Sequence, residues 1–173
     1  MKTIGQYIIF VVVVLLLQIF LLNNLTFTTL VAPTLYILCI VLLPLDTSPV
    51  KILFAGLALG VLMDITMGTC GLNTLTTLPI AFFRRSILHL TAGFSDFDNE
   101  SDIPCIKRLG RFRFHRYIIS IASLHSLLFF SFEHLSFSNF GFFLARFVCS
   151  TIATLCLVYL MLVIFIPKLT AKK

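Results

Sequence analysis

The amino-acid sequence predicts an all-α integral membrane protein, a bundle of six transmembrane helices with both termini in the cytoplasm. Hydrophobic residues make up 59% of the chain and charged residues 12%, and the mean hydropathy is +1.07. A soluble domain is about 45–50% apolar and about 25% charged. One membrane span takes about 20 residues. Six spans would therefore use most of the chain, and we expect a single membrane domain over residues 1–173.

The first two spans are predicted from the apolar runs at residues 4–22 and 25–45. Lys2 before the first run also suggests a signal peptide. However, the run is longer than a usual signal-peptide core, and residues 21–24 are not a small-residue cleavage site. Pro33 lies inside the second run and removes a backbone donor. Membrane helices tolerate this where neighbouring helices satisfy the freed groups.

Four further spans are predicted at residues 49–67, 71–90, 117–137 and 140–167. Pro79 lies inside the fourth span and is expected to bend it, because proline disrupts the helical hydrogen-bond ladder. A hydrophilic segment at residues 91–116 separates the fourth span from the fifth. We expect this segment to be a cytoplasmic loop.

The basic residues gather on one side of this predicted topology. Cytoplasmic loops of membrane proteins are enriched in Lys and Arg. With the N-terminus inside, twelve of the thirteen Lys and Arg residues fall on the inner side, and Arg146 lies within the sixth span. The outer connections near residues 23–29, 68–71 and 133–139 hold none. Because an odd number of spans would divide this asymmetry, the charges favour six.

Three glycines and a carboxylate recur every four residues in the third span: Gly56, Gly60, Asp64 and Gly68. On a helix this spacing places them along a single face, which we call the glycine face. Glycines four residues apart let another helix approach closely. The glycine face therefore either packs the bundle internally or docks a membrane helix of a partner, and internal packing is the more frequent use.

Asp64 and Arg146 are predicted at a similar depth below the outer membrane surface. An ionisable group at such a depth is expensive unless it is paired or reaches polar surroundings. The two side chains could form an ion pair or share a small outward-facing polar pocket. Alternatively, each could extend separately to the nearby interface. The sequence leaves these alternatives open.

Other polar residues occur at membrane depth. His125 lies near the middle of the fifth span. A proton relay is conceivable, but we expect a neutral ring that is hydrogen-bonded to a neighbouring group. The start of the fourth span could line a cavity, but hydrogen bonds between helices explain its polar residues more simply. These residues are Asn73, Thr74, Thr76 and Thr77.

Basic residues at the inner ends of the fourth and fifth spans predict a membrane-surface cluster. Lys and Arg beside a span bind anionic lipid head groups at about 1 kcal/mol per residue. Arginines interleaved with aromatic residues could also contact RNA, and the loop could dock a cytosolic protein. The position beside a span favours anionic lipid, and we expect no nucleic-acid partner. The cluster comprises Arg84, Arg85, Lys107, Arg108, Arg111, Arg113 and Arg116.

Motifs of enzyme or metal chemistry are missing from the sequence. There is no HExxH, no GxSxG, no glycine-rich phosphate loop and no carboxylate pair on one span. The acidic residues at 96–102 resemble the start of a calcium loop, but Ser101 replaces the required glycine and Lys107 the closing glutamate. The five cysteines form no CxxC pair. We therefore expect no catalytic residue, no metal site and no cofactor.

Several short stretches, mostly within residues 18–85, carry a family resemblance. They are Asn23-Asn24, residues 33–38, residues 42–44, residues 60–65, Gly71-Leu72 and Arg84-Arg85. Together with the chain length, the six-span layout and the basic C-terminus, they make this sequence similar to the rod shape-determining protein MreD family of bacteria. The resemblance is to the form of that family seen in Bacteroidetes-like sequences.

This resemblance implies a non-enzymatic, multi-pass scaffold of the bacterial inner membrane. Members of the family bind MreC within the cell-wall elongation complex, which contains MreB, RodA and its partner transpeptidase. That complex supports cell shape and peptidoglycan synthesis. The resemblance also implies a fold similar to the substrate-binding subunits of energy-coupling-factor transporters.

The competing function is a small-molecule, vitamin-type binding subunit of a transporter. Such a subunit needs polar or aromatic ligand groups that converge in one pocket. The chain has no Trp and only four Tyr, and the centres of its predicted spans are mostly aliphatic. These features favour the scaffold.

Overall fold

The structure of this chain, a computed structural model, describes residues 2–22, 31–93, 103–104, 106–133 and 140–169. All regular elements in these ranges are helices, as the sequence predicts. In chain order they are α1 (Lys2–Leu16), which continues as the π-helix η1 (Leu17–Leu22), α2 (Ile37–Val41), α3 (Pro49–Met67), α4 (Leu72–Ala92), α5 (Ile106–Leu109), α6 (Arg111–Glu133) and α7 (Phe140–Leu169).

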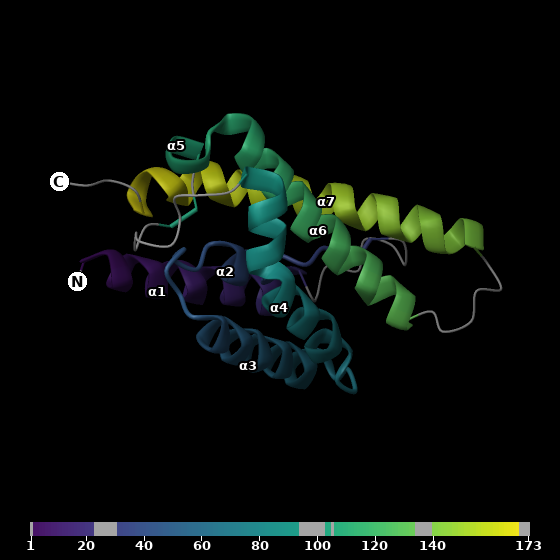
Figure 1. Cartoon of the computed structure of the whole chain (residues 1–173). Coiled ribbons are helices and arrows are strands. Elements are labelled where there is room, and N and C mark those ends of the chain that lie inside the picture. Colours follow the sequence, from purple (N-terminus) through teal and green to yellow (C-terminus); the bar gives the residue numbers. More distant parts are fainter. Residues whose placement is uncertain (1, 23–30, 94–102, 105, 134–139, 170–173) are drawn as a thin grey trace.

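The long helices α1, α3, α6 and α7 run broadly along the length of the molecule in Figure 1, whereas α4 crosses them steeply. The start of α1, the start of α3 and the end of α7 lie toward the left of Figure 1. The end of α3, the end of α6 and the start of α7 lie toward the right. The short helix α2 lies among the long ones and contacts α1, α3, α4 and α6. The bundle is therefore built around α2.

Helix α3 begins and ends where its sequence predicts. Pro49 occupies the start of the helix, where a missing backbone N–H costs no hydrogen bond, and Ser48 before it is extended. The helix ends at Gly68, which has a φ of 66°. Glycine is favoured in this left-handed conformation because it has no Cβ.

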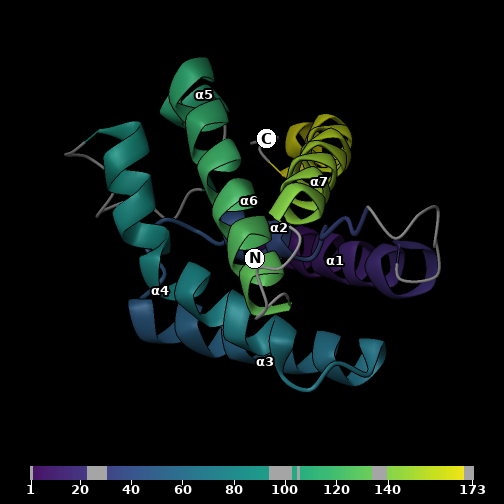
Figure 2. The ribbon, with the colours of Figure 1, turned by 90° about the vertical axis from the view of Figure 1, so that its right-hand side faces the viewer.

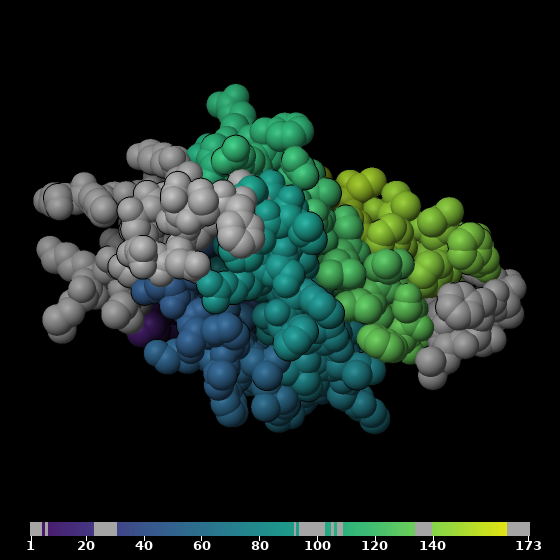
Figure 3. All heavy atoms as spheres, in the orientation of Figure 1, coloured from purple at the N-terminus to yellow at the C-terminus, as the bar shows by residue number. Residues whose placement is uncertain are grey.

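Helix α4 packs along α3 at its start and then bends away from α3 and rises beside α6 (Figure 2). Pro79 lies inside the helix. Proline removes one hydrogen bond of the helical ladder and kinks the helix. The change of direction in α4 agrees with the bend predicted at this proline. In the space-filling view the atoms of α4 and α6 meet along their shared length (Figure 3).

The second predicted span is not a continuous helix. Residues 31–36 have no regular helical structure, and only Ile37–Val41 of this span is α-helical, whereas residues 23–30 lie outside the described ranges. Pro33 and Pro44 flank α2 on its two sides. Proline disfavours the helical conformation of the residue before it. The prediction of one continuous helix over 25–45 is therefore wrong, because within the described residues 31–45 only Ile37–Val41 is α-helical.

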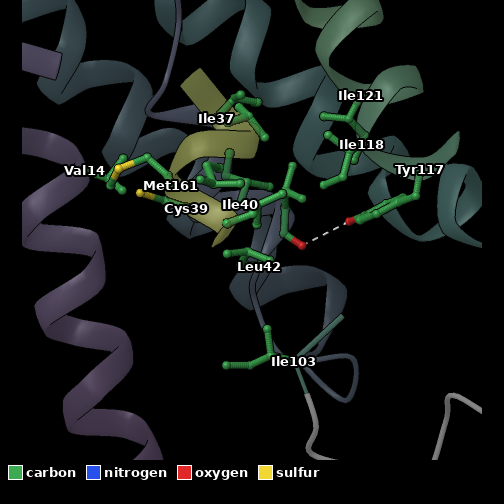
Figure 4. Packing of buried hydrophobic residues seen from close by; sticks show 14 of the residues in the cluster. Val14, Ile37, Cys39, Ile40, Leu42, Ile103, Tyr117, Ile118, Ile121 and Met161 are labelled. Carbon is green, nitrogen blue, oxygen red and sulfur yellow. Dashed lines mark hydrogen bonds between the residues drawn. The ribbon is translucent and has the colours of Figure 1, made fainter. Parts of the chain in front are cut away.

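The apolar core is centred on α2, whose five residues are all buried. Figure 4 shows Ile37 and Ile40 among side chains from other helices, including Ile118 of α6 and Met161 of α7. Ile103, which precedes α5, belongs to the same cluster. An apolar run that is too short to cross a membrane as a helix is thus buried inside the protein.

Two helices are long and apolar enough to cross a membrane: Pro49–Met67, and Phe140–Phe165 within α7. Residues 7–22 form a shorter apolar helix. Only 28% of the apolar stretch in α3 and 33% of that in α7 is buried inside the protein. A core helix of a soluble domain would be mostly buried, so these two helices turn most of their apolar surface outward.

Candidate functional site

Several polar side chains are buried in the bundle beside its apolar core, and many large apolar side chains lie on its outside. Gln18, Asn73 and His125 are fully buried. By contrast, Ile65 is 74% exposed and Val163 is 76% exposed. Buried polar groups require partners inside the protein, because burial removes their hydrogen bonds to water. The partners of these groups define the candidate site.

The Asp64 carboxylate at the end of α3 accepts hydrogen bonds from the start of α4. One oxygen, Oδ1, accepts from the hydroxyl of Thr69 at 2.6 Å and from the backbone N–H of Asn73 at 2.8 Å. The other, Oδ2, accepts from the backbone N–H and the hydroxyl of Thr74, at 2.9 and 2.6 Å. The first N–H groups of a helix have no partner within it, and a carboxylate there also interacts favourably with the helix dipole. Asp64 therefore caps α4 from a different helix.

Asn73 connects Asp64 to the centre of the bundle. Its side-chain N–H₂ donates to Asp64 Oδ1 at 3.2 Å, and its Oδ1 accepts from the hydroxyl of Tyr36 at 3.2 Å. The Tyr36 hydroxyl also lies 2.9 Å from Nε2 of His125 and 3.2 Å from the hydroxyl of Thr77. These bonds join α3, α4, α6 and the segment before α2. The predicted hydrogen bonding between helices is confirmed for Asn73, Thr74 and Thr77, whereas Thr76 bonds to the carbonyl of Asn73 within α4.

His125 is hydrogen-bonded on both ring nitrogens, as expected for a structural histidine. Its Nδ1 lies 3.3 Å from the hydroxyl of Thr34, and its Nε2 faces Tyr36. In a neutral ring that carries its proton on Nε2, Nε2–H donates to the Tyr36 oxygen and Nδ1 accepts from Thr34. The Tyr36 hydroxyl then remains free to donate to Asn73. One neutral tautomer therefore satisfies every contact of the ring.

The irregular backbone at residues 31–36 obtains its hydrogen bonds from side chains of surrounding helices. The N–H of Ala32 donates to the hydroxyl of Ser150 at 3.0 Å, and the N–H of Thr34 donates to the hydroxyl of Thr154 at 3.1 Å. The N–H of Leu35 donates to Oε1 of Gln18 at 2.6 Å. Non-helical backbone at membrane depth is tolerated where protein groups satisfy it in this way.

The backbone at the end of α2 is satisfied from three helices. The hydroxyl of Tyr7 donates to the carbonyl of Cys39 at 2.6 Å. The hydroxyl of Tyr117 donates to the carbonyl of Val41 at 3.2 Å, which is the dashed line in Figure 4. The guanidinium of Arg84 donates to the carbonyls of Val41 and Leu43. A cation at this end also interacts favourably with the helix dipole.

Arg84 is therefore not part of a membrane-surface cluster. Its side chain is only 2% exposed, and it points inward to the end of α2. Arg85, Arg111, Arg113 and Arg116 are exposed, as predicted. The side chains of the two other predicted members, Lys107 and Arg108, lie outside the described ones. Adjacent arginines differ in this way because successive residues of a helix point about 100° apart.

The glycine face packs inside the bundle. A Cβ added at Gly56 would lie 2.7 Å from Cβ of Ala81, and one added at Gly60 would lie 2.6 Å from Cα of Thr74. Both neighbours belong to α4, so these glycines let α3 and α4 approach closely. Gly68 instead ends α3, and nothing lies within 4 Å of its added Cβ. Of the two uses predicted for the glycine face, the structure has internal packing at Gly56 and Gly60.

Asp64 and Arg146 do not form the predicted ion pair. Arg146 pairs with Glu133 of α6, with 2.9 Å from Nη1 to Oε2 and 3.2 Å from Nη2 to Oε1. Its guanidinium also lies 5.0 Å from the centre of the Phe130 ring. The oxygens of Asp64 are engaged by Thr69, Asn73 and Thr74. The ion pair was predicted only because the two residues lie at a similar depth. The start of α4, which follows Asp64 closely in the sequence, supplies hydrogen-bond donors to its carboxylate instead.

Three residues of the network were not predicted from the sequence, namely Gln18, Tyr36 and Tyr117. A signal was present at Gln18, the single amide within the apolar run of residues 7–22. A polar residue in such a run needs a partner inside the protein. Its partners, Pro33 and Leu35, could not be found because they follow from the irregular path of residues 31–36.

No family model matches this sequence, and neither a curated protein nor a solved structure matches it. Among the described residues, no three His, Cys, Asp or Glu side chains lie close enough to hold a metal ion together.

Proposed function

We propose that this chain is a multi-pass protein of the bacterial inner membrane that crosses the bilayer six times, with both termini in the cytoplasm. The passes are α1 with η1, the segment around α2, α3, α4, α6 and α7. The exposed apolar faces of α3 and α7 support this proposal, because water would not solvate them well. The common end shared by the start of α1 and the end of α7 also supports an even number of passes (Figure 1).

We infer further that the bundle is a non-enzymatic scaffold of the cell-wall elongation complex and binds MreC. One observation carries this inference: the polar residues at depth serve the fold itself. Asp64 caps α4, His125 bonds to Tyr36 and Thr34, and Arg84 holds the end of α2. Because these polar groups are engaged in holding the helices together, the bundle acts as a rigid body. Its outer surface then contacts lipid and partner helices. The stretches that resemble MreD include several of these structural residues.

Co-purification tests the scaffold function. The full chain carries an affinity tag, is co-expressed with MreC and is isolated from membranes in mild detergent. We expect MreC to co-purify with the wild-type chain and with Gly141→Ala, since a Cβ at Gly141 would meet nothing within 4 Å. Gly60→Leu, which forces a side chain into the backbone of Thr74, should lose MreC together with the fold. A folded wild-type chain that never retains MreC would contradict the proposal.

The alternative is a small-molecule, vitamin-type binding subunit of a transporter. One observation favours it, namely the non-helical backbone at residues 31–36 inside the bundle. Many transporters bind substrates where a membrane helix is interrupted. In this chain, however, the backbone N–H groups of Ala32, Thr34 and Leu35 are already bonded to side chains. Recovery of a bound small molecule or an ATPase partner, in place of MreC, would favour the transporter subunit.

A further inference from the structure

The first turns of α6 direct three arginines and a phenylalanine away from the bundle. Arg111, Arg113 and Arg116 are exposed, and the Phe112 side chain is 73% exposed. The guanidinium of Arg116 lies 5.7 Å from the centre of the Phe112 ring. We call these four residues the basic surface. The chain around the start of α6 projects from the body of the molecule at the top of Figure 3.

Two neighbouring residues fix the direction of the basic surface. Phe114 is fully buried. His115 Nδ1 lies 2.9 Å from the hydroxyl of Tyr159 on α7. Phe114 therefore holds the side of α6 opposite the basic surface against the bundle, and His115 links the helix to α7. The four residues of the basic surface therefore remain on the outside and do not turn inward.

The length of α6 places the basic surface at the edge of a bilayer. The helix has 23 residues, which corresponds to about 35 Å at a rise of about 1.5 Å per residue. The hydrocarbon core of a bilayer is only about 30 Å thick. In the proposed topology the first turns of α6 then lie among the head groups of the cytoplasmic leaflet.

We propose that the basic surface binds the head groups of anionic phospholipids in that leaflet. No Asp or Glu occurs from residue 103 to residue 132, so the charged residues of this stretch are all basic. Guanidinium groups bind phosphate oxygens with two parallel hydrogen bonds. The Phe112 ring can insert at the boundary between head groups and acyl chains, where aromatic rings are favoured. This inference depends on the membrane placement in the proposed function, but not on the scaffold role.

Lipid selectivity of the full chain in vesicles tests the proposal. The chain is reconstituted in phosphatidylcholine vesicles that contain either spin-labelled phosphatidylglycerol or spin-labelled phosphatidylcholine, and electron paramagnetic resonance measures the immobilised fraction of each. We expect the wild type to prefer phosphatidylglycerol. Replacing Arg111, Arg113 and Arg116 with Gln should lower that preference at least fivefold, because one basic residue near the surface contributes roughly fivefold. Replacement of the same three with Lys keeps the charge and should retain most of it.

Several results would overturn the proposal. Equal immobilisation of both lipids by the wild type, or an unchanged preference in the Gln variant, would show that the basic surface does not select head groups. Displacement of the spin-labelled lipid by a single-stranded RNA oligomer would assign the surface to nucleic acid. A preference for phosphatidylglycerol that appears only after four acidic residues are replaced with Asn would show that the basic surface of the wild type binds the acidic segment of the same chain. Those residues are Asp96, Asp98, Glu100 and Asp102.

The scaffold role and the lipid proposal can fail separately. A chain that selects phosphatidylglycerol but does not retain MreC would leave the lipid proposal intact and contradict the scaffold. A chain that immobilises neither lipid would contradict the membrane placement and the lipid proposal together.

Discussion

At the scale of single residues, the most consequential side chain is Asp64, because one carboxylate serves both helices of a pair. It belongs to α3, and its oxygens accept from backbone N–H groups and side chains at the start of α4. The side chain at this position must therefore present two acceptor oxygens at the same time. Hydrogen bonds to a charged group contribute about 1.5–3 kcal/mol each to stability, more than bonds between neutral groups.

Asp64→Asn should destabilise the fold, because its amide N–H₂ cannot accept the bonds that one carboxylate oxygen now accepts. We expect a loss of about 2–3 kcal/mol of unfolding free energy. Thermal unfolding in detergent, followed by circular dichroism, measures the change. Asp46→Asn is the matched control, since Asp46 is an exposed carboxylate outside the long helices. Equal stability of the two variants would show that Asp64 does not support α4.

Gly60→Ala should also destabilise the fold, since the added methyl group would lie 2.6 Å from the Cα of Thr74. Backbone atoms cannot rotate away, so α3 and α4 would have to separate, at a cost of about 1–3 kcal/mol. Gly141→Ala provides the control, because the same methyl group meets nothing there. Its melting temperature should be unchanged or slightly higher. A Gly60→Ala variant as stable as this control would mean that the helices are not in close contact.

At the scale of elements, the segment around α2 differs most from a regular membrane helix. A helix satisfies its own backbone, whereas residues 31–36 depend on side chains of α1/η1 and α7. The end of α2 depends on Tyr7, Tyr117 and Arg84. Helix α1 with η1, and helices α4, α6 and α7, thus each contribute a polar group to this central segment. This dependence couples the stability of α2 to correct assembly of the other helices.

The bond between Tyr36 and His125 should show this coupling in a double-mutant cycle. We expect Tyr36→Phe and His125→Phe to be non-additive by about 0.6–2 kcal/mol, the range found for hydrogen bonds between membrane helices. Unfolding in mixed micelles at increasing denaturing detergent measures each variant. Tyr36→Phe combined with His115→Phe is the control pair, because His115 bonds to Tyr159 instead. Coupling as large in the control pair would mean that the effect does not arise from the Tyr36–His125 contact.

At the scale of the whole molecule, the outer surface is more apolar than that of a water-soluble domain, and polar side chains lie beside the apolar core. The described interior holds Gln18, Asn73 and His125, and the outside carries exposed apolar side chains such as Ile65 and Val163. In water this surface would associate with other apolar surfaces. In a bilayer it is solvated by acyl chains, and only the ends of the helices need polar surroundings.

The proposed topology predicts different labelling of single cysteines by a membrane-impermeant maleimide. Cys70 is exposed at the turn between α3 and α4, so it should react in intact spheroplasts. Cys149 is exposed on the apolar surface of α7 and should react only with a membrane-permeant reagent. A cysteine introduced by Arg113→Cys should react only after the membrane is opened. Labelling of residue 113 in intact spheroplasts would reverse the topology and remove the basis of the proposed function.

The sequence by itself determined the helical class, the apolar outward faces of the long helices, and the ends of α3 at Pro49 and Gly68. Composition and local chemistry are sufficient for these properties, because they depend on solvation and on backbone preferences within a few residues. The predicted number of six passes rests on the charge distribution and stays a prediction. The internal hydrogen bonding of His125 was also foreseen, since a buried imidazole needs a partner.

Only the tertiary structure decided the path of residues 31–45, the burial of Arg84, and the separate partners of Asp64 and Arg146. These features depend on contacts with neighbouring helices, whose residues are often far away along the chain. For example, Thr34 bonds to Thr154 across 120 residues. Arg84 was expected at the membrane surface because its charge marks the end of a span. The carbonyls at the end of α2 bind it in the interior instead, and they are free to do so because the second predicted span is not a continuous helix.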